Sequence, residues 1–201
     1  MEVSVSMLDI SNFPWAECSI TENRTDYRAD TLALRRKSRS TGVHRFEFEL
    51  VTVEMELKIA RGVKAKLSAA TDETIVFTHP RLSYCQGTEP ASKIQAFGVN
   101  SADSKLLSLT SIGAWQLLAG DYLQVDNDSK VYEVAEDTLL QVGNQIVTLT
   151  SPLRYSLTAA TNIIVNDVTW HLLSNGVIET GGMQASDNQD MELTLVAVEK
   201  L

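Results

Sequence analysis

The sequence predicts a β-rich α+β protein with a single amphipathic helix. Two observations carry this prediction. Residues 43–50 alternate strictly between apolar and polar or charged side chains, which is the pattern of a half-buried β-strand. Beyond Pro80 the chain consists of short β-branched runs separated by turn residues. Strands at such spacing are typical of a small barrel or sandwich.

The alternating segment gives the clearest strand. Phe46, Phe48 and Leu50 fall on one face, and the intervening arginine and glutamates fall on the other. Successive side chains of a strand point to opposite sides of the sheet, so the three apolar residues are expected to face a core.

A helix is expected over residues 54–70. Apolar side chains recur there at about one helical turn, namely Met55, Ile59, Val63 and Leu67. Glutamates near the start and lysines near the end suit the helix dipole, which favours a helix. Gly62 interrupts it, and residues 53–59 also fit an extended strand. A short strand, 74–77, follows, so this region is predicted as strand, helix, strand.

The remaining strands are predicted from β-branched runs. We expect them at residues 94–99, 106–110, 122–125, 130–135, 145–149, 162–165, 168–173 and 191–198. The clearest hairpin joins 122–125 to 130–134 through a four-residue polar loop. In the last segment Leu193, Leu195 and Ala197 can share one face, and this strand is free to pair with strands from the N-terminal part.

The net charge is −9 and the isoelectric point is near 4.8. Such a chain repels phosphate, so stable binding to nucleic acid or to an anionic membrane is not expected. The acidity is uneven. Residues 1–80 hold 11 Lys and Arg against 12 Asp and Glu, a net −1, whereas residues 81–201 hold 6 against 14, a net −8.

Basic residues concentrate in one short run, Arg35, Arg36, Lys37 and Arg39, and again in Lys58, Arg61, Lys64 and Lys66. Most charge runs are solvated surface, and this is the first interpretation. The second is a contact with an acidic neighbour, such as another copy of the same chain. The four residues of the first run are the candidate contact residues of the sequence.

Three features of the sequence bear on cellular location: its apolar stretches, its first residues and its number of cysteines. No stretch approaches the ~18 apolar residues of a membrane span, and the first residues hold an acid where a secretory signal has its basic end. Two cysteines, Cys18 and Cys85, are too few for a disulfide scaffold. We therefore expect a soluble, unprocessed protein made in a reducing cytoplasm.

No motif for metal or cofactor binding stands out. His44, His79 and His171 are far apart in sequence and show no metal-ligand spacing. Cys85 lacks the flanking pattern of a nucleophile, so a buried thiol is the preferred interpretation. We expect no metal, no cofactor and no enzymatic activity.

The acidic loop at 126–128 resembles the start of a calcium loop but departs from it later. No glycine stands at the sixth place, and Asp137 occupies the twelfth, where a bidentate glutamate is needed. A polar hairpin tip explains these residues better. The Gly181-Gly182 pair lacks the Lys-Ser/Thr of a phosphate-binding loop and indicates a flexible loop.

Four aromatic residues of the second half offer a different possibility, namely Trp115, Tyr122, Tyr132 and Tyr155. Such rings can stack on sugars or bases. Tyrosine and tryptophan are also common strand and core residues, and this interpretation is preferred.

The order of elements resembles that of one known family. Strand, amphipathic helix and short strand are followed by the turn-and-strand 119–125, Ala-Gly-Asp-Tyr-Leu-Gln-Val, and by its return 130–134, Lys-Val-Tyr-Glu-Val. In this order and these motifs, residues 25–201 resemble the distal tail proteins of long-tailed, non-contractile bacteriophages. Residues 1–24 have no counterpart in the resemblance.

The resemblance implies a split architecture and a structural role. Residues 1–80 and 167–201 would form a β-rich, ring-forming domain, and residues 81–166 would form an inserted barrel resembling the oligonucleotide/oligosaccharide-binding fold. The protein would be a hexameric ring in the virion tail tip, contacting tail tube and hub proteins while DNA passes through its lumen. Two alternatives are a carbohydrate-binding module acting through the inserted barrel and, more distantly, a small hydrolase.

Overall fold

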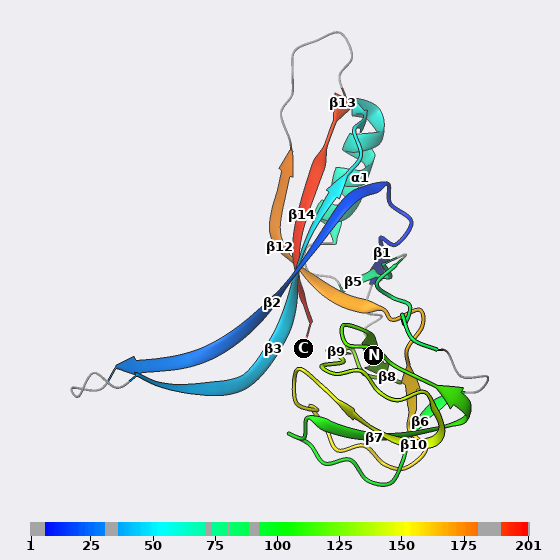
Figure 1. Ribbon diagram of the computed structural model, residues 1–201. Helices are drawn as coiled ribbons and strands as arrows, with labels where there is room; N and C mark the ends of the chain where they lie inside the picture. Colours follow the sequence, from blue (N-terminus) through cyan, green and yellow to red (C-terminus); the bar gives the residue numbers. More distant parts are fainter. Residues whose placement is uncertain are drawn as a thin grey trace, which may run out of the picture. The chain divides into compact units, whose positions relative to one another are not determined.

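The structure is a computed structural model that describes residues 7–30, 36–70, 74–79, 81–88, 93–180 and 190–200 (Figure 1). Their side chains are described except in 24–30, 36–43, 175–180 and at 190. The described residues form two six-stranded sheets, a small two-stranded sheet and one helix. The predicted β-rich α+β class is confirmed at this level.

The chain divides into two compact units. The first contains Met1–Arg24, His44–Phe77 and His171–Leu201, and the second contains Thr25–Val43 and Thr78–Trp170. Along the chain the units change over at 77/78 and 170/171. The domain boundaries expected from the sequence, 80/81 and 166/167, stay a prediction. Segment 25–43, which was expected in the outer domain, groups with the second unit.

The sheet of the first unit has the order β1-β5-β12-β14-β3-β2. The bounds of these strands are Met7–Asp9, Thr74–Phe77, Trp170–Thr180, Leu193–Glu199, Arg36–Thr52 and Trp15–Asp30. β1 runs parallel to β5, whereas β14 is antiparallel to both β12 and β3. The sequence patterns did not reveal β2, which forms one edge of this sheet.

The core of the first unit contains the residues that alternation predicted. Phe46, Phe48 and Leu50 of β3 are at most 1% exposed. Opposite them, Leu195 pairs with Leu50 and Ala197 with Phe48, and both residues of β14 are fully buried. The facing assignment is confirmed on both strands, because their period of two keeps the apolar side chains on the same side.

The helix α1 spans Leu57–Ala69 and is shorter than predicted. Met55 and Glu56 form β4, which pairs with β13, Asp190–Met191, so residues before 57 are extended. The predicted face is therefore partly wrong: Leu67 is buried, but Ile59 is 53% exposed and Ala60 is buried instead. Met55 lies before the helix and cannot belong to its face. The apolar face of the helix is formed by Leu57, Ala60, Val63 and Leu67.

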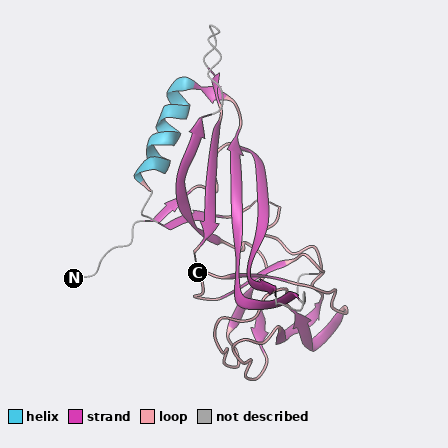
Figure 2. Cartoon of the chain, turned by 90° about the vertical axis from the view of Figure 1, so that its left-hand side faces the viewer, coloured by secondary structure: helices cyan, strands magenta, loops and turns pink. Residues whose placement is uncertain are grey.

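The buried side of α1 packs on the sheet of its own unit. Ala60 clusters with Met55, Met191 and Leu193, and Leu57 and Val63 pack against this cluster at its rim. Figure 2 shows α1 alongside the strands. The dipole argument holds at one end only, because Lys66 lies in the last turn while the first turn contains no acidic residue.

The second sheet has the order β10-β7-β6-β11-β8-β9. Its strands span Gln141–Thr148, Leu106–Trp115, Ile94–Ala96, Asn162–Ile164, Tyr122–Val125 and Val131–Glu133. Beyond β9, Val134 bridges to Leu149, and Ala135 N–H donates to the Thr148 carbonyl at 2.8 Å. These contacts bring the two outer strands together at one end, so the sheet curls into a half-barrel.

The predicted hairpin is confirmed as β8 and β9. Tyr122 pairs with Glu133, and Gln124 with Val131. At the tip, Asn127 has φ 67°, in the left-handed region that asparagine tolerates, so 126–128 form a polar turn.

Residues 167–170 are the last residues of the second unit. Val168 and Trp170 are fully buried. Val168 N–H donates to the Ser83 carbonyl at 3.1 Å, and the Trp170 ring meets Tyr122 edge-on, with centroids 5.3 Å apart. A fragment ending at 166 loses all of these contacts.

We therefore predict that a fragment 78–170 unfolds cooperatively in urea, whereas a fragment 81–166 is less stable by at least ~2 kcal/mol, the order expected when a buried tryptophan is removed. Circular dichroism of both fragments measures this. Equal stability would show that 167–170 contribute nothing to the second unit.

Candidate functional site

The predicted basic run lies on a long two-stranded hairpin. Arg36, Lys37 and Arg39 occupy the first residues of β3, and Arg35 lies outside the described residues. β2 has 16 residues and β3 has 17, and the two are neighbours in the sheet (Figure 1). The basic run therefore sits at the end of β3 that the chain reaches from the hairpin loop.

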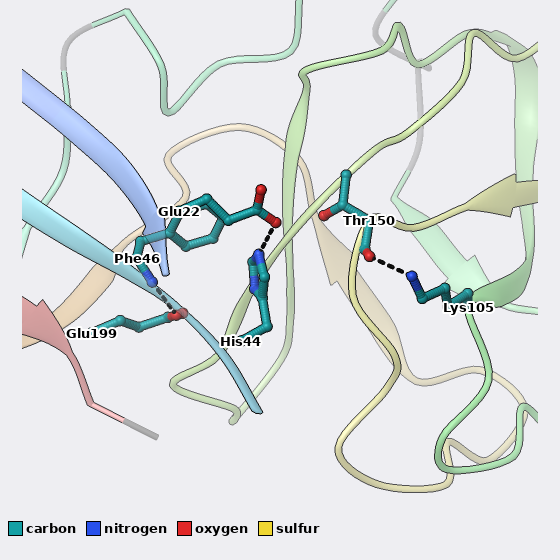
Figure 3. A network of polar contacts seen from close by, with 6 residues as sticks. All are labelled: Glu22, His44, Phe46, Lys105, Thr150 and Glu199. Carbon is teal, nitrogen blue, oxygen red and sulfur yellow. Dashed lines mark hydrogen bonds and ion pairs between the residues drawn. The ribbon is translucent and has the colours of Figure 1, made fainter. Parts of the chain in front are cut away.

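A polar cluster marks the place where the hairpin leaves the first unit. His44 Nε2 forms an ion pair with Glu22 Oε1 across the hairpin (Figure 3). Beside it, Asn23 Nδ2 donates to Glu47 Oε1 at 2.8 Å. His44 is 5% exposed and its ring meets Phe46 edge-on at 5.0 Å. The first unit includes residues up to 24 and resumes at 44, so these contacts join β2 to β3 at its limit.

A buried carboxylate joins the same strand to the C-terminal one. Glu199 is 1% exposed, and its Oε2 accepts a hydrogen bond from the Phe46 backbone N–H at 3.2 Å (Figure 3). Next to it, Lys200 Nζ donates to Thr74 Oγ1 of β5 at 2.7 Å. A buried charge is tolerated only when hydrogen-bonded, so these contacts fasten the end of β14. These contacts join β3, β14 and β5.

The candidate aromatic residues of the second unit divide into two groups. Trp115 and Tyr132 are at most 1% exposed and belong to the core of the half-barrel. Tyr122 contacts Trp170. Tyr155 is 56% exposed, with the Arg154 guanidinium 5.0 Å from its ring centroid. Two of the four rings are thus unavailable for stacking on a sugar.

The Ala-Gly-Asp turn owes its form to a buried carboxylate. Asp121 is 1% exposed, and its two oxygens accept backbone N–H groups from Gln86 at 2.7 Å and from Leu118 at 2.8 Å. Gly120 has φ 87°, which favours glycine. The motif therefore positions the start of β8.

The three histidines come from different parts of the chain, His44 from β3, His171 from β12 and His79 from the segment after β5. His44 pairs with Glu22, and His79 Nδ1 accepts the backbone N–H groups of Arg81 at 3.1 Å and Leu82 at 2.9 Å. Within the described part of the chain, no three His, Cys, Asp or Glu side chains are grouped so as to hold a metal. The expectation that no metal is bound stays a prediction.

The two thiols belong to different units, Cys18 to the first and Cys85 to the second. Burial raises the pKa of the Cys18 thiol to about 11, which disfavours the reactive thiolate. Cys85 is partly buried and packs against the core of the half-barrel. The preferred interpretation of Cys85 as a packed thiol is consistent with this position. The Gly181-Gly182 pair lies outside the described residues.

Neither the family models nor the curated proteins gave a match to this chain. In the part of the chain that the structure covers, no helix is both long and apolar enough to cross a membrane.

The sequence patterns missed the polar cluster of Glu22, His44 and Glu199, because its members are distant in sequence. They also missed a feature that was visible: residues 106–120 and 138–153 contain no charged side chain. The structure pairs these two segments as β7 and β10.

We predict that Glu199→Ala destabilises the protein by about 1–3 kcal/mol, because the buried Phe46 N–H loses its acceptor. Glu49→Ala is the matched control: Glu49 is exposed on the same strand β3, and its loss should change stability by less than about 0.5 kcal/mol. Thermal unfolding measures both. Equal effects would show that the Glu199 contact contributes nothing.

A pH effect follows from His79. Burial and the nearby Arg81 lower the pKa of its imidazole below 6.5, and the neutral Nδ1 is the form that accepts hydrogen bonds. The stabilisation is complete above the unfolded pKa of 6.5 and is lost as the pH falls from there through the folded-state pKa.

His79→Asn tests this prediction, because the Asn Oδ1 can accept the same N–H groups and does not titrate. From about pH 7 to about pH 5, a range that brackets the pKa of a free imidazole, the wild-type protein should lose more free energy of unfolding in urea than the variant. Identical slopes would contradict the prediction.

Proposed function

We propose that this protein is a structural component of a bacteriophage tail tip and not an enzyme. It forms a hexameric distal tail ring that links the tail tube protein to the tip or hub proteins and lets DNA pass through its lumen. The resemblance of element order and of the 119–134 motif suggested this role. The observation that carries it is the β2–β3 hairpin, whose strands of 16 and 17 residues carry a basic run near their connection.

The hairpin differs in charge from the remainder of the chain. Residues 25–43 hold five Lys and Arg against two Asp and Glu, a net +3, which leaves −12 on the other residues. Opposite charges on separate parts of one chain favour association between copies and fix its register. The hairpin of one copy therefore contacts an acidic surface of the next through Arg35, Arg36, Lys37 and Arg39.

Such a contact generates a ring. The hairpin and the acidic surface are different patches, so the contact is heterologous, and a heterologous contact closes into a ring when its rotation allows. In this proposal acidic groups line the lumen and repel the phosphates of DNA within the Debye length of about 10 Å. The protein therefore binds no nucleic acid stably and is located in the virion after synthesis in the bacterial host.

The second unit fits the inserted barrel of this proposal. Its curled sheet and its single continuous core support a small barrel, and we propose that it is of the oligonucleotide/oligosaccharide-binding type. The alternative of a carbohydrate-binding module is weaker, because Trp115 and Tyr132 are core residues.

Assembly tests the hairpin contact. We predict that replacing Arg35, Arg36, Lys37 and Arg39 together by Ser abolishes ring or tail assembly, followed by light scattering, and that assembly of the wild-type protein weakens as salt is raised. The matched control replaces Lys58, Arg61, Lys64 and Lys66 of α1, which changes the net charge equally. If both variants assemble alike, the basic run is a solvated loop.

Electron microscopy of intact particles tests the function itself. Six-fold density at the tail tip should fit this chain, with acidic side chains toward the lumen. Density that belongs to a different protein would overturn the proposed function, and a neutral or basic wall would overturn the lumen proposal alone.

A further inference from the structure

The paired strands β7 and β10 form a surface without charge. Although 21% of the chain is charged, residues 106–120 and 138–153 contain no charged side chain. One face of the pair is buried in the half-barrel, where Leu107, Leu109 and Val147 are fully buried. The other face exposes large apolar residues: Leu106 (55%), Ile112 (80%), Val142 (67%) and Ile146 (64%).

β10 is also an edge strand, since it stands first in the order of its sheet. Leu149 N–H donates toward β7, to the Lys105 carbonyl at 2.8 Å, whereas the Thr148 carbonyl accepts from Ala135 on the opposite side. Backbone direction alternates along a strand, so Ile146 and Asn144 also direct their N–H and C=O groups away from β7.

At Asn144 the outward backbone carbonyl meets an exposed side chain. The Asn144 carbonyl accepts a hydrogen bond from the exposed Gln141 side chain at 3.0 Å, a contact that another strand can replace. At the other end of the β7–β10 pair, Lys105 Nζ donates a hydrogen bond to the Thr150 carbonyl at 2.8 Å (Figure 3). Proteins protect edge strands with charges or proline, and β10 contains neither.

The side-chain pattern of β10 is symmetric about Asn144. Val142 and Ile146 stand two residues to either side of it. In an antiparallel pair centred on Asn144, the two asparagines face each other. Val142, which precedes the register shift of β10 at Gly143, then lies near Ile146 of the partner subunit. Apolar β-branched pairs and amide pairs are favourable cross-strand neighbours.

We propose that β10 pairs with β10 of a second copy of this chain through a two-fold contact centred on Asn144. Two copies of net charge −9 repel each other, and a strand without charge lets them meet without opposing or desolvating like charges. Because Gly143 (φ 85°) bends the strand beside Asn144, the paired segment is short and the contact is weak.

This contact goes beyond the proposed function and does not depend on it. A two-fold contact uses the same patch on both copies and joins them in pairs. The ring contact proposed above uses the hairpin and a different patch. Each can therefore fail while the other holds.

Disulfide trapping tests the register directly. In this pairing the two Cα atoms at position 144 lie about 5.5 Å apart, within the range of a disulfide. Asn144→Cys should give a disulfide-linked dimer under mild oxidation. Thr110→Cys is the matched control, because Thr110 lies opposite Asn144 on β7, inside the sheet. The wild-type protein controls for Cys18 and Cys85.

Sedimentation equilibrium of the full chain measures the association, up to concentrations on the order of 100 µM. The wild-type mass should rise toward twice 22.1 kDa, and Ile146→Lys should weaken dimerisation at least about tenfold, since it places two cations at the apolar pairs. Ile146 is exposed, so folding should be unaffected, and circular dichroism checks this.

Three results would overturn the proposal: equal trapping of Asn144→Cys and Thr110→Cys, a wild-type chain that stays monomeric, or an association that Ile146→Lys leaves unchanged. If the four-residue hairpin variant abolishes association while Ile146→Lys does not, the contact lies in the hairpin. That result supports the ring proposal and excludes the β10 contact.

Discussion

The pairing of β3 with β14 is the constraint on which the first unit depends. These strands come from residues 36–52 and 193–199, so the unit closes only when the last residues of the chain reach a strand near its beginning. β14 is central, with β12 on its other side. Closing such a long loop costs conformational entropy. The burial of the apolar faces of both strands offsets this cost.

Buried polar contacts fix the register of strands, which apolar burial alone does not determine. A sheet of alternating residues specifies a face, but strands can still slide along each other by two residues. Glu199 removes this freedom in the first unit by accepting the Phe46 N–H. In the second unit the buried carboxylate of Asp121 fixes the turn before β8, because it accepts the backbone N–H groups of Gln86 and Leu118. Both carboxylates are costly when unpaired, so each favours the one arrangement that satisfies it.

The two contacts proposed for this chain differ in character. The hairpin is basic on an otherwise acidic chain, so the contact proposed for it would be electrostatic and would depend on salt. The paired strands β7 and β10 contain no charged side chain. The contact proposed for β10 therefore relies on backbone pairing and apolar burial and would respond little to salt. A protein that uses both can assemble in two independent directions, one through each surface.

The local sequence determined much of the fold. Alternation alone located β3 and its buried face, and β5 and β8 have the predicted bounds. Period-two burial is a local property, so a single strand reveals it. The helix was found for the same reason, but its starting residue was not, because Met55 pairs with a strand more than a hundred residues away.

Only the tertiary structure decided the remainder. β2 shows no clean alternation, and its place beside β3 depends on the hairpin. The Glu22–His44 and Phe46–Glu199 contacts join residues that no local pattern connects. The basic run was evident in the sequence, whereas its position at the start of β3, beside β2, was not. Likewise, the uncharged segments could be read from the sequence, but strand order alone makes β10 an edge, because edge status is a property of neighbours and not of residues.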